Sequence, residues 1–135
     1  TRTTSSAASD VYKRQADVII CHGSLHTGKR EEVRKNVAIC SRWLKPGGYM
    51  LVRAKCNFHW AQTDVNSYNW RIEDVHRWSN DFNLKVHTPV EVCYAKDKRG
   101  ELMARFVWWW KKLSRDEWLD SKTKVQTKHI NWKIV

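Results

Sequence analysis

The feature that most constrains this chain is a strand–helix–strand pattern between residues 17 and 54. The run 17–21 (DVIIC) is short, apolar and β-branched, as expected of a strand that is buried on both faces. Apolar residues then recur at steps of four, three and four, the spacing of one helix face. They are Val33, Val37, Cys40 and Leu44. A second apolar run follows at 49–54 (YMLVRA), so we expect a parallel βαβ unit with a right-handed crossover.

The helix is expected to end at the turn 45–48 (KPGG). Pro46 disfavours helical geometry in Lys45, and the two glycines that follow permit a tight turn. A long loop, 56–69, leads to a second predicted helix, 70–79. Its inward face would carry Ile72, Val75 and Trp78.

The segment 84–110 predicts an antiparallel hairpin. A strand is expected at 84–94, and Pro89 favours an edge position because proline cannot donate a hydrogen bond to a neighbouring strand. The turn 96–100 (KDKRG) leads into a returning strand, 102–110. Residues 106–110 (FVWWW) are apolar on both faces, so this strand should be buried at the centre, with helices above and below.

Composition excludes several classes of protein. The chain of 135 residues is 41% hydrophobic and 29% charged, which is not the balance of a disordered chain. No apolar run approaches the ~18 residues of a membrane span, and no signal peptide is evident. The four cysteines form no CxxC pair, so we expect reduced thiols and a cytoplasmic protein.

These elements resemble the C-terminal half of the class I S-adenosylmethionine-dependent methyltransferases. The run 17–20 followed by Ser24, Leu25 and His26 looks like the fourth strand of that family and its loop. The segment 44–52 (LKPGGYMLV) is similar to the turn and fifth strand, and the hairpin matches the sixth and seventh strands. The resemblance implies a partial doubly wound α/β sheet. Two parallel strands are followed by a parallel edge strand and an antiparallel closing strand.

The same resemblance divides the chain into three parts. Residues 16–113 would be the methyltransferase half-domain, and the glycine-rich loop that holds most of the cofactor in this family has no counterpart, because no GxG occurs in the sequence. We therefore expect a fragment that is inactive by itself. Residues 1–15 are either a disordered leader or non-native sequence, since they resemble translated sequencing-adapter read-through of metagenomic assemblies.

Residues 114–135 form an extension of unknown structure. Its SRDE segment, 114–117, has the pattern of a capping box and predicts a short helix. Further on, Ile130, Trp132 and Ile134 alternate as in a strand.

Ligands of an open parallel sheet bind beyond the carboxyl ends of its strands. That edge would place Cys21, His22 and Gly23 near S-adenosylmethionine, with His26 a further candidate. Lys55 is the catalytic candidate, because 47–55 resembles a strand of fibrillarin-like RNA 2'-O-methyltransferases in which a lysine activates a ribose hydroxyl. The sequence departs from that family at Cys21-His22, where those enzymes place an aspartate.

The chain carries 25 Lys and Arg against 14 Asp and Glu, which favours an anionic substrate such as RNA. Aromatic side chains of the long loop would stack on bases, and cations at the sheet edge would hold phosphates. The predicted substrate-binding residues are Arg53, Trp60, Tyr68, Lys98 and Arg99.

Three alternatives stay open at this point. Instead of stacking on bases, the aromatic side chains of the loop would pack against the second helix. Instead of holding phosphates, the cations would be ordinary solvent-exposed side chains. The chain as a whole would instead be a non-enzymatic basic module that binds nucleic acid. The spacing CxxH at Cys56 and His59 fits a zinc site only loosely, and we predict no metal.

Overall fold

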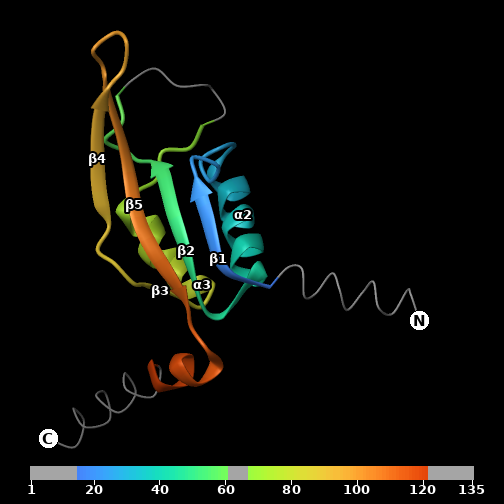
Figure 1. The fold of residues 1–135 in the computed structure, drawn as a ribbon. Coiled ribbons are helices and arrows are strands. Elements are labelled where there is room, and N and C mark those ends of the chain that lie inside the picture. The colour runs from blue at the N-terminus through green and yellow to red at the C-terminus, as the bar shows by residue number, and fades with distance from the viewer. Residues whose placement is uncertain (1–14, 61–66, 122–135) are drawn as a thin grey trace, which may run out of the picture.

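The predicted strand–helix–strand unit is confirmed in the computed structural model, which describes residues 15–60 and 67–121 (Figure 1). Strand β1 (Ala16–His22) runs parallel to β2 (Leu44–Lys55), and helix α2 (Arg30–Trp43) connects them. Glu31 and Glu32 lie in the first turn of α2, where their negative charge complements the helix dipole.

The helix ends one residue earlier than predicted, and β2 begins five residues earlier, at Leu44 rather than Tyr49. Leu44 is buried, but it belongs to the strand and not to the helix face. Gly48 explains why the KPGG segment can join the sheet. A Cβ at Gly48 would lie 2.8 Å from the backbone oxygen of Asp17, so only glycine allows β1 and β2 to approach here.

The closing strand β5 (Leu102–Lys112) is central and antiparallel to β2, as predicted. The prediction of one edge strand over 84–94 is wrong. The structure has two short strands, β3 (Leu84–Val86) and β4 (Glu91–Lys96), and both pair with β5. The break contains Pro89, and the hydroxyl of Thr88 accepts the backbone N–H of Trp109 at 3.0 Å in place of a strand carbonyl.

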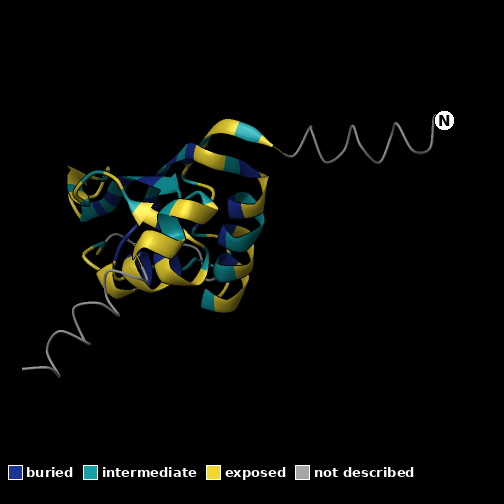
Figure 2. Ribbon diagram, turned by 90° about the horizontal axis from the view of Figure 1, so that it is seen from below, coloured by how far each residue is buried: buried dark blue, intermediate teal, exposed yellow. Residues whose placement is uncertain are grey.

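Helices α2 and α3 (Ile72–Asp81) both cover the same face of the sheet (Figure 1). The core between the two layers contains four fully buried tryptophans in tilted or edge-to-face contact. They are Trp70, Trp78, Trp108 and Trp110. Buried residues, dark blue in Figure 2, follow the sides of the helices that face the sheet, and exposed residues follow the outward sides.

The expectation of helices above and below the sheet is wrong for the described residues. Val18 and Ile20 are 51% and 64% exposed on the opposite face, and Trp109 is half-buried there. Among the described strands β1 lies at the edge of the sheet, and one of its faces is open and apolar, so it is not buried on both faces. Ile72 also differs from expectation. It is the first residue of α3 and is 39% exposed, because the helix starts two residues later than predicted.

The predicted capping box after β5 is confirmed. The hydroxyl of Ser114 accepts the backbone N–H of Glu117 at 3.2 Å, and the Glu117 carboxylate accepts the backbone N–H of Ser114 at 3.5 Å. A helix follows at 115–121. The predictions for residues 1–14 and for Ile130 to Ile134 lie outside the described residues. Within the described part of the chain, no helix is both long and apolar enough to cross a membrane.

Candidate functional site

The candidate site lies at the end of the sheet where β1 and β2 finish and β5 begins (Figure 1). Strand pairing brings its residues together. His22 lies opposite Arg53 in the β1–β2 pair, and Lys55 lies opposite Arg105 in the β2–β5 pair. Ligands of an open parallel sheet bind at the carboxyl ends of its strands, so this edge is the candidate site.

His22 and Gly23 both contact Arg53. The Arg53 Nη1 atom lies 2.9 Å from His22 Nε2, and the backbone N–H of Gly23 donates to the Arg53 carbonyl at 2.9 Å. Gly23 has φ +79, a conformation that favours glycine. A Cβ at Gly23 would lie 3.6 Å from Arg105 Nη1 and 3.8 Å from His26 Cε1, so the guanidinium and the imidazole both flank this loop.

Two histidines are held by backbone donors at this edge. His26 Nδ1 accepts the N–H of Lys55 at 3.3 Å, and His59 Nδ1 accepts the N–H of Ala104 at 3.1 Å. With Nδ1 occupied as an acceptor, the proton of each neutral ring is on Nε2. The sequence analysis considered His59 only as a zinc ligand. No spacing pattern indicated that it would lie at this edge of the sheet.

Burial keeps both rings neutral. It lowers the pKa of His26 to about 4, and the nearby positive charges of Lys55 and Arg105 act in the same direction. Burial, followed by the charge of Lys55, also lowers the pKa of His59. Both side chains are therefore uncharged hydrogen-bond donors near pH 7.

Lys55, the predicted catalytic residue, is the last residue of β2 and is only 9% exposed. Its carbonyl accepts the N–H of Trp70 at 2.8 Å, which joins the strand end to the segment before α3. The structure thus brings Lys55 into the same cluster as Arg53, Arg105 and the two histidines. Its catalytic role stays a prediction.

Cys21 is placed differently from its predicted neighbours. Its side chain is buried on the helix-covered face, and a hydrogen bond with the Cys40 thiol, together with burial, raises the pKa of Cys21. Cys21 therefore presents only its backbone to the strand-end edge. Cys56, which begins the CxxH spacing, is also fully buried.

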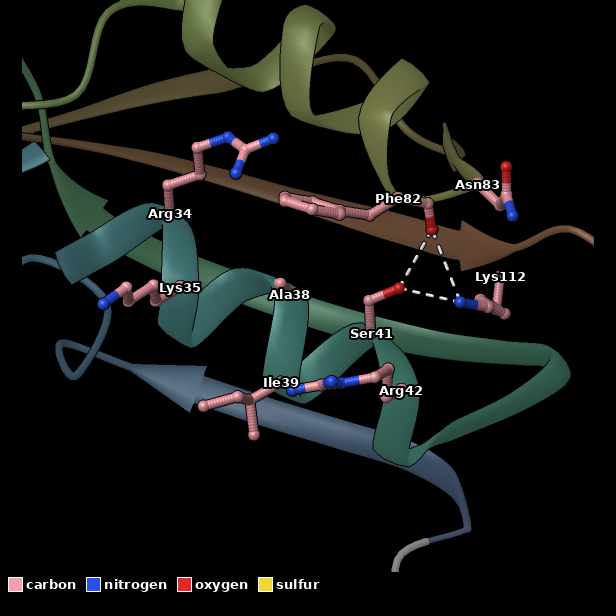
Figure 3. A pocket seen from close by; sticks show the side chains of 9 residues that line it. All are labelled: Arg34, Lys35, Ala38, Ile39, Ser41, Arg42, Phe82, Asn83 and Lys112. Atoms are coloured by element: carbon pink, nitrogen blue, oxygen red, sulfur yellow. Dashed lines mark hydrogen bonds between the residues drawn. The ribbon is translucent and has the colours of Figure 1, made fainter. Parts of the chain in front are cut away.

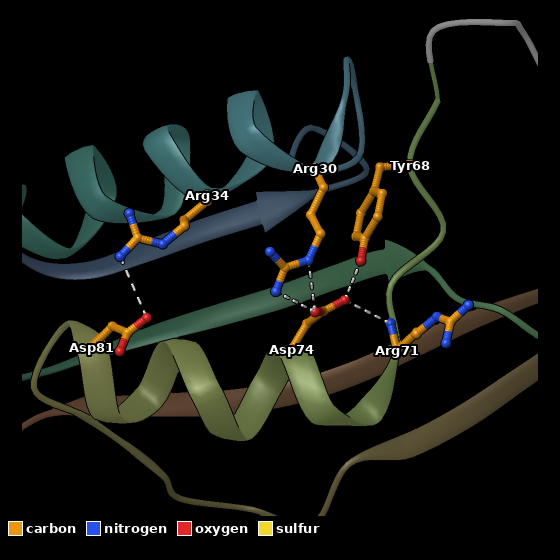
Figure 4. Close-up of polar contacts among 6 residues, drawn as sticks. All are labelled: Arg30, Arg34, Tyr68, Arg71, Asp74 and Asp81. Atoms are coloured by element: carbon orange, nitrogen blue, oxygen red, sulfur yellow. Dashed lines mark hydrogen bonds and ion pairs between the residues drawn. The ribbon is translucent and has the colours of Figure 1, made fainter.

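Tyr68 lies in a polar network between α2 and α3 and not in the edge cluster (Figure 4). Its hydroxyl donates to the Asp74 carboxylate, which also accepts from the Arg30 side chain at 3.1 Å and the backbone N–H of Arg71 at 3.0 Å. Burial and Asp74 raise the pKa of Tyr68 to about 12. This placement gives Tyr68 a packing role and does not support its prediction as a substrate-binding residue.

The remaining predicted substrate-binding residues lie toward the β4–β5 hairpin. Trp60 is 79% exposed, with its backbone N–H donating to the Leu102 carbonyl at 2.9 Å, so it does not pack against α3. Lys98 and Arg99 are exposed at the hairpin turn. Asp97 Oδ1 stabilises this turn by accepting the backbone N–H groups of Arg99 and Glu101, each at 2.8 Å.

The fold and its strand-end site define a class: a partial Rossmann-like α/β sheet with an antiparallel closing strand, covered by helices on one face in the described residues. No protein-family model matches the chain, and no curated protein does. Among solved structures, the chain is similar to a SAM-dependent methyltransferase from Methanosarcina mazei. The identity is 15% and the TM-score 0.57, over 72% of this chain and 59% of that chain.

A second solved structure was determined in work on the conversion of a disulfide bond into a thioacetal group during echinomycin biosynthesis. It is 9% identical, with a TM-score of 0.53, over 83% of this chain and 55% of that chain. The chain thus spans less than two thirds of the length of either structure. At these identities the likeness shows the fold, and the activity has to be argued from the site.

Proposed function

We propose that this chain is the C-terminal half of an S-adenosylmethionine-dependent methyltransferase. The observation that carries the proposal is the position of β5, which is antiparallel and inserted between the parallel β1–β2 pair and the edge strands β3 and β4. This arrangement was predicted from the family resemblance, and the fold is shared with a SAM-dependent methyltransferase.

The open side of β1 supports the proposal that the sheet continues. In the described part of the chain, β1 pairs only with β2, and Val18 and Ile20 leave apolar surface beside that free edge. An exposed apolar edge strand is a liability that proteins ordinarily cover. Further strands and helices from a longer protein would cover it.

The residues at the strand ends fit part of such a cofactor. Gly23 has no side chain to shield its backbone, which would allow a nucleoside to approach closely. The glycine-rich loop that holds most of this cofactor in the family has no counterpart in the sequence. Tight binding would therefore need elements from outside this chain.

When bound, S-adenosylmethionine supplies an activated methyl group on a sulfonium, which an acceptor displaces in line. The contribution of this chain would be to position the acceptor, since alignment at short range accounts for much of the rate of such displacements. Arg53, Arg105 and the imidazoles of His26 and His59 would hold the acceptor. In a narrower form of the proposal, Lys55 assists the loss of a proton from an acceptor hydroxyl.

RNA is our narrower proposal for the acceptor. It is supported by Trp60, whose 79% exposure makes its ring available for stacking, and by the cations of the neighbouring hairpin turn. The non-enzymatic alternative, a basic module that binds nucleic acid, rests on the same two features and needs no cofactor.

Calorimetry with S-adenosylhomocysteine, the demethylated product, tests the main proposal. The longer gene product should bind it, and the 135-residue chain should bind it weakly or not at all. Gly23→Val in the longer protein should weaken binding, whereas Gly100→Val should not. The two glycines have nearly the same φ, +79 and +80, but Gly100 lies in the hairpin turn. Absence of binding by the longer protein would overturn the proposal.

A further inference from the structure

We infer that the acceptor carries a phosphate group, and that Arg105 and the Nε2–H groups of His26 and His59 bind it at the strand-end edge. This inference rests on the proposed function, because it names the substrate class of the same site. The net charge of the chain favours anionic substrates in general, whereas this inference assigns one phosphate group to one cluster of donors.

The cluster offers hydrogen-bond donors and positive charge, and the Asp97 carboxylate also acts on His59. Each imidazole uses its Nδ1 atom to accept a backbone N–H, so its free polar atom is a donor. Arg105 adds the forked donors of a guanidinium, which match phosphate oxygens two at a time. No ion pair among the described residues involves Arg105.

The three donors are held close to one another by the strand pairing. Arg105 and His26 flank the same point at Gly23, and Ala104, which anchors His59, is the neighbour of Arg105 on β5. After burial, the charges of Lys55 and Arg105 also act to lower the pKa of both imidazoles. The proposed phosphate would lie among these three groups.

The chemistry of the proposed reaction favours the same assignment. The sulfonium of the cofactor is a cation, and Arg105 and Lys55 at the same edge add positive charge that would oppose its binding. An acceptor with a phosphate would neutralise this charge and draw the acceptor to the edge.

A cationic pocket elsewhere in the fold is less suitable for an anion (Figure 3). It is a cavity of about 490 Å³ between α2 and α3, lined in part by Arg34, Lys35, Arg42 and Lys112. Lys112 Nζ donates to Ser41 Oγ at 2.8 Å and to the Phe82 carbonyl at 3.4 Å. The carboxyl ends of both helices lie here, and their partial negative charge favours the lysine and disfavours a bound anion.

Histidine-selective NMR on the 135-residue chain tests the inference with inorganic phosphate as the probe. Phosphate should shift the signals of His26 and His59 and raise the pKa of His26, since a bound anion favours the imidazolium. Arg105→Gln should weaken phosphate binding about tenfold or more, as expected for loss of a charge-assisted hydrogen bond. Arg77→Gln is the matched control, because Arg77 is exposed on α3 and away from the edge.

His59→Asn provides a second variant. Its amide oxygen can replace Nδ1 as the acceptor for the Ala104 N–H, but it removes the Nε2–H donor, so phosphate binding should weaken while the fold is kept. Equal weakening by Arg105→Gln and Arg77→Gln, or histidine signals that ignore phosphate, would overturn the inference. Tighter binding of acetate than of phosphate would overturn the assignment to a phosphate. None of these outcomes depends on the cofactor, so they are separate from failure of S-adenosylhomocysteine binding.

Discussion

Lys55 and Arg105 are direct partners across the antiparallel β2–β5 pair, and both side chains contribute positive charge to the edge where β1 and β2 end. The same edge holds His26 and His59, each fixed by a backbone N–H. The candidate site is thus built from segments around residues 26, 55–59 and 105, which are far apart in the sequence.

The buried tryptophans of β5 should dominate the stability of the fold. Trp108→Ala should lower the free energy of unfolding by about 3–5 kcal/mol, because Trp108 is fully buried against Trp70 and Trp110. Trp109→Ala should cost only about 1 kcal/mol, since Trp109 is half-buried on the open face. Urea unfolding of both variants measures the difference, and equal losses would contradict the assignment of the two faces.

Stability should fall in mild acid because of His26. The pKa of His26 is about 4 in the folded chain and near 6.5 when unfolded, so the unfolded state binds more protons between these values. The stability associated with the neutral His26 ring is fully present above pH 6.5 and is lost progressively as the pH falls toward 4. Urea unfolding at a series of pH values should show this loss.

His26→Asn should flatten that part of the pH profile. The Asn amide oxygen can accept the Lys55 N–H in place of Nδ1, but the side chain does not titrate. His76→Asn, at an exposed histidine of α3, is the control and should leave the profile as in the parent chain. A profile that His26→Asn does not change would contradict the prediction.

The contact between α2 and α3 should be stabilised mainly by the buried carboxylate of Asp74. Asp74 accepts from Arg30, Tyr68 and the backbone of Arg71, so Asp74→Asn should lower the free energy of unfolding by about 2–3 kcal/mol. Asp81→Asn removes a similar but exposed contact with Arg34, at 3.4 Å, and should cost less than about 1 kcal/mol. Thermal or urea unfolding distinguishes the two, and a larger loss for Asp81→Asn would contradict this ranking.

If the acceptor is RNA, its binding should respond to salt and to stacking in different ways. Trp60→Ala should weaken binding by about 1–3 kcal/mol with little change in salt dependence, because base stacking releases few counterions. Replacement of Lys98 and Arg99 by Gln should reduce the salt dependence, because phosphate pairing releases counterions. Fluorescence anisotropy with a short single-stranded RNA measures both.

Trp43→Ala is the matched control, since Trp43 is a partly exposed tryptophan at the far end of α2. RNA binding that is independent of salt would count against the RNA proposal. Equal effects of Trp60→Ala and Trp43→Ala would count against stacking by Trp60.

Local signals were sufficient to predict most of the secondary structure. The helical spacing of Val33, Val37 and Cys40 acts over a few residues, so it predicted α2 to within one residue of its end. The turn chemistry of Pro46 and Gly47 placed the start of β2 five residues too late, because these residues belong to the strand. The hairpin that ends in β5 was equally clear, because its turn lies between two apolar runs. The order of helices and strands also predicted the edge of the sheet at which the parallel strands end.

Tertiary structure decided which side chains meet at that edge and which faces are covered. Val18, Ile20 and Trp109 are as apolar as their buried neighbours. Because the helices cover the other face, Val18 and Ile20 remain exposed and Trp109 is only half-buried. No spacing in the sequence predicts that His59 and Arg105 lie near His26, because that proximity depends on the pairing of β2 with β5. Periodicity reports the contacts of a residue with its own helix or strand, whereas a site assembled from separate segments depends on long-range pairing that no local pattern encodes.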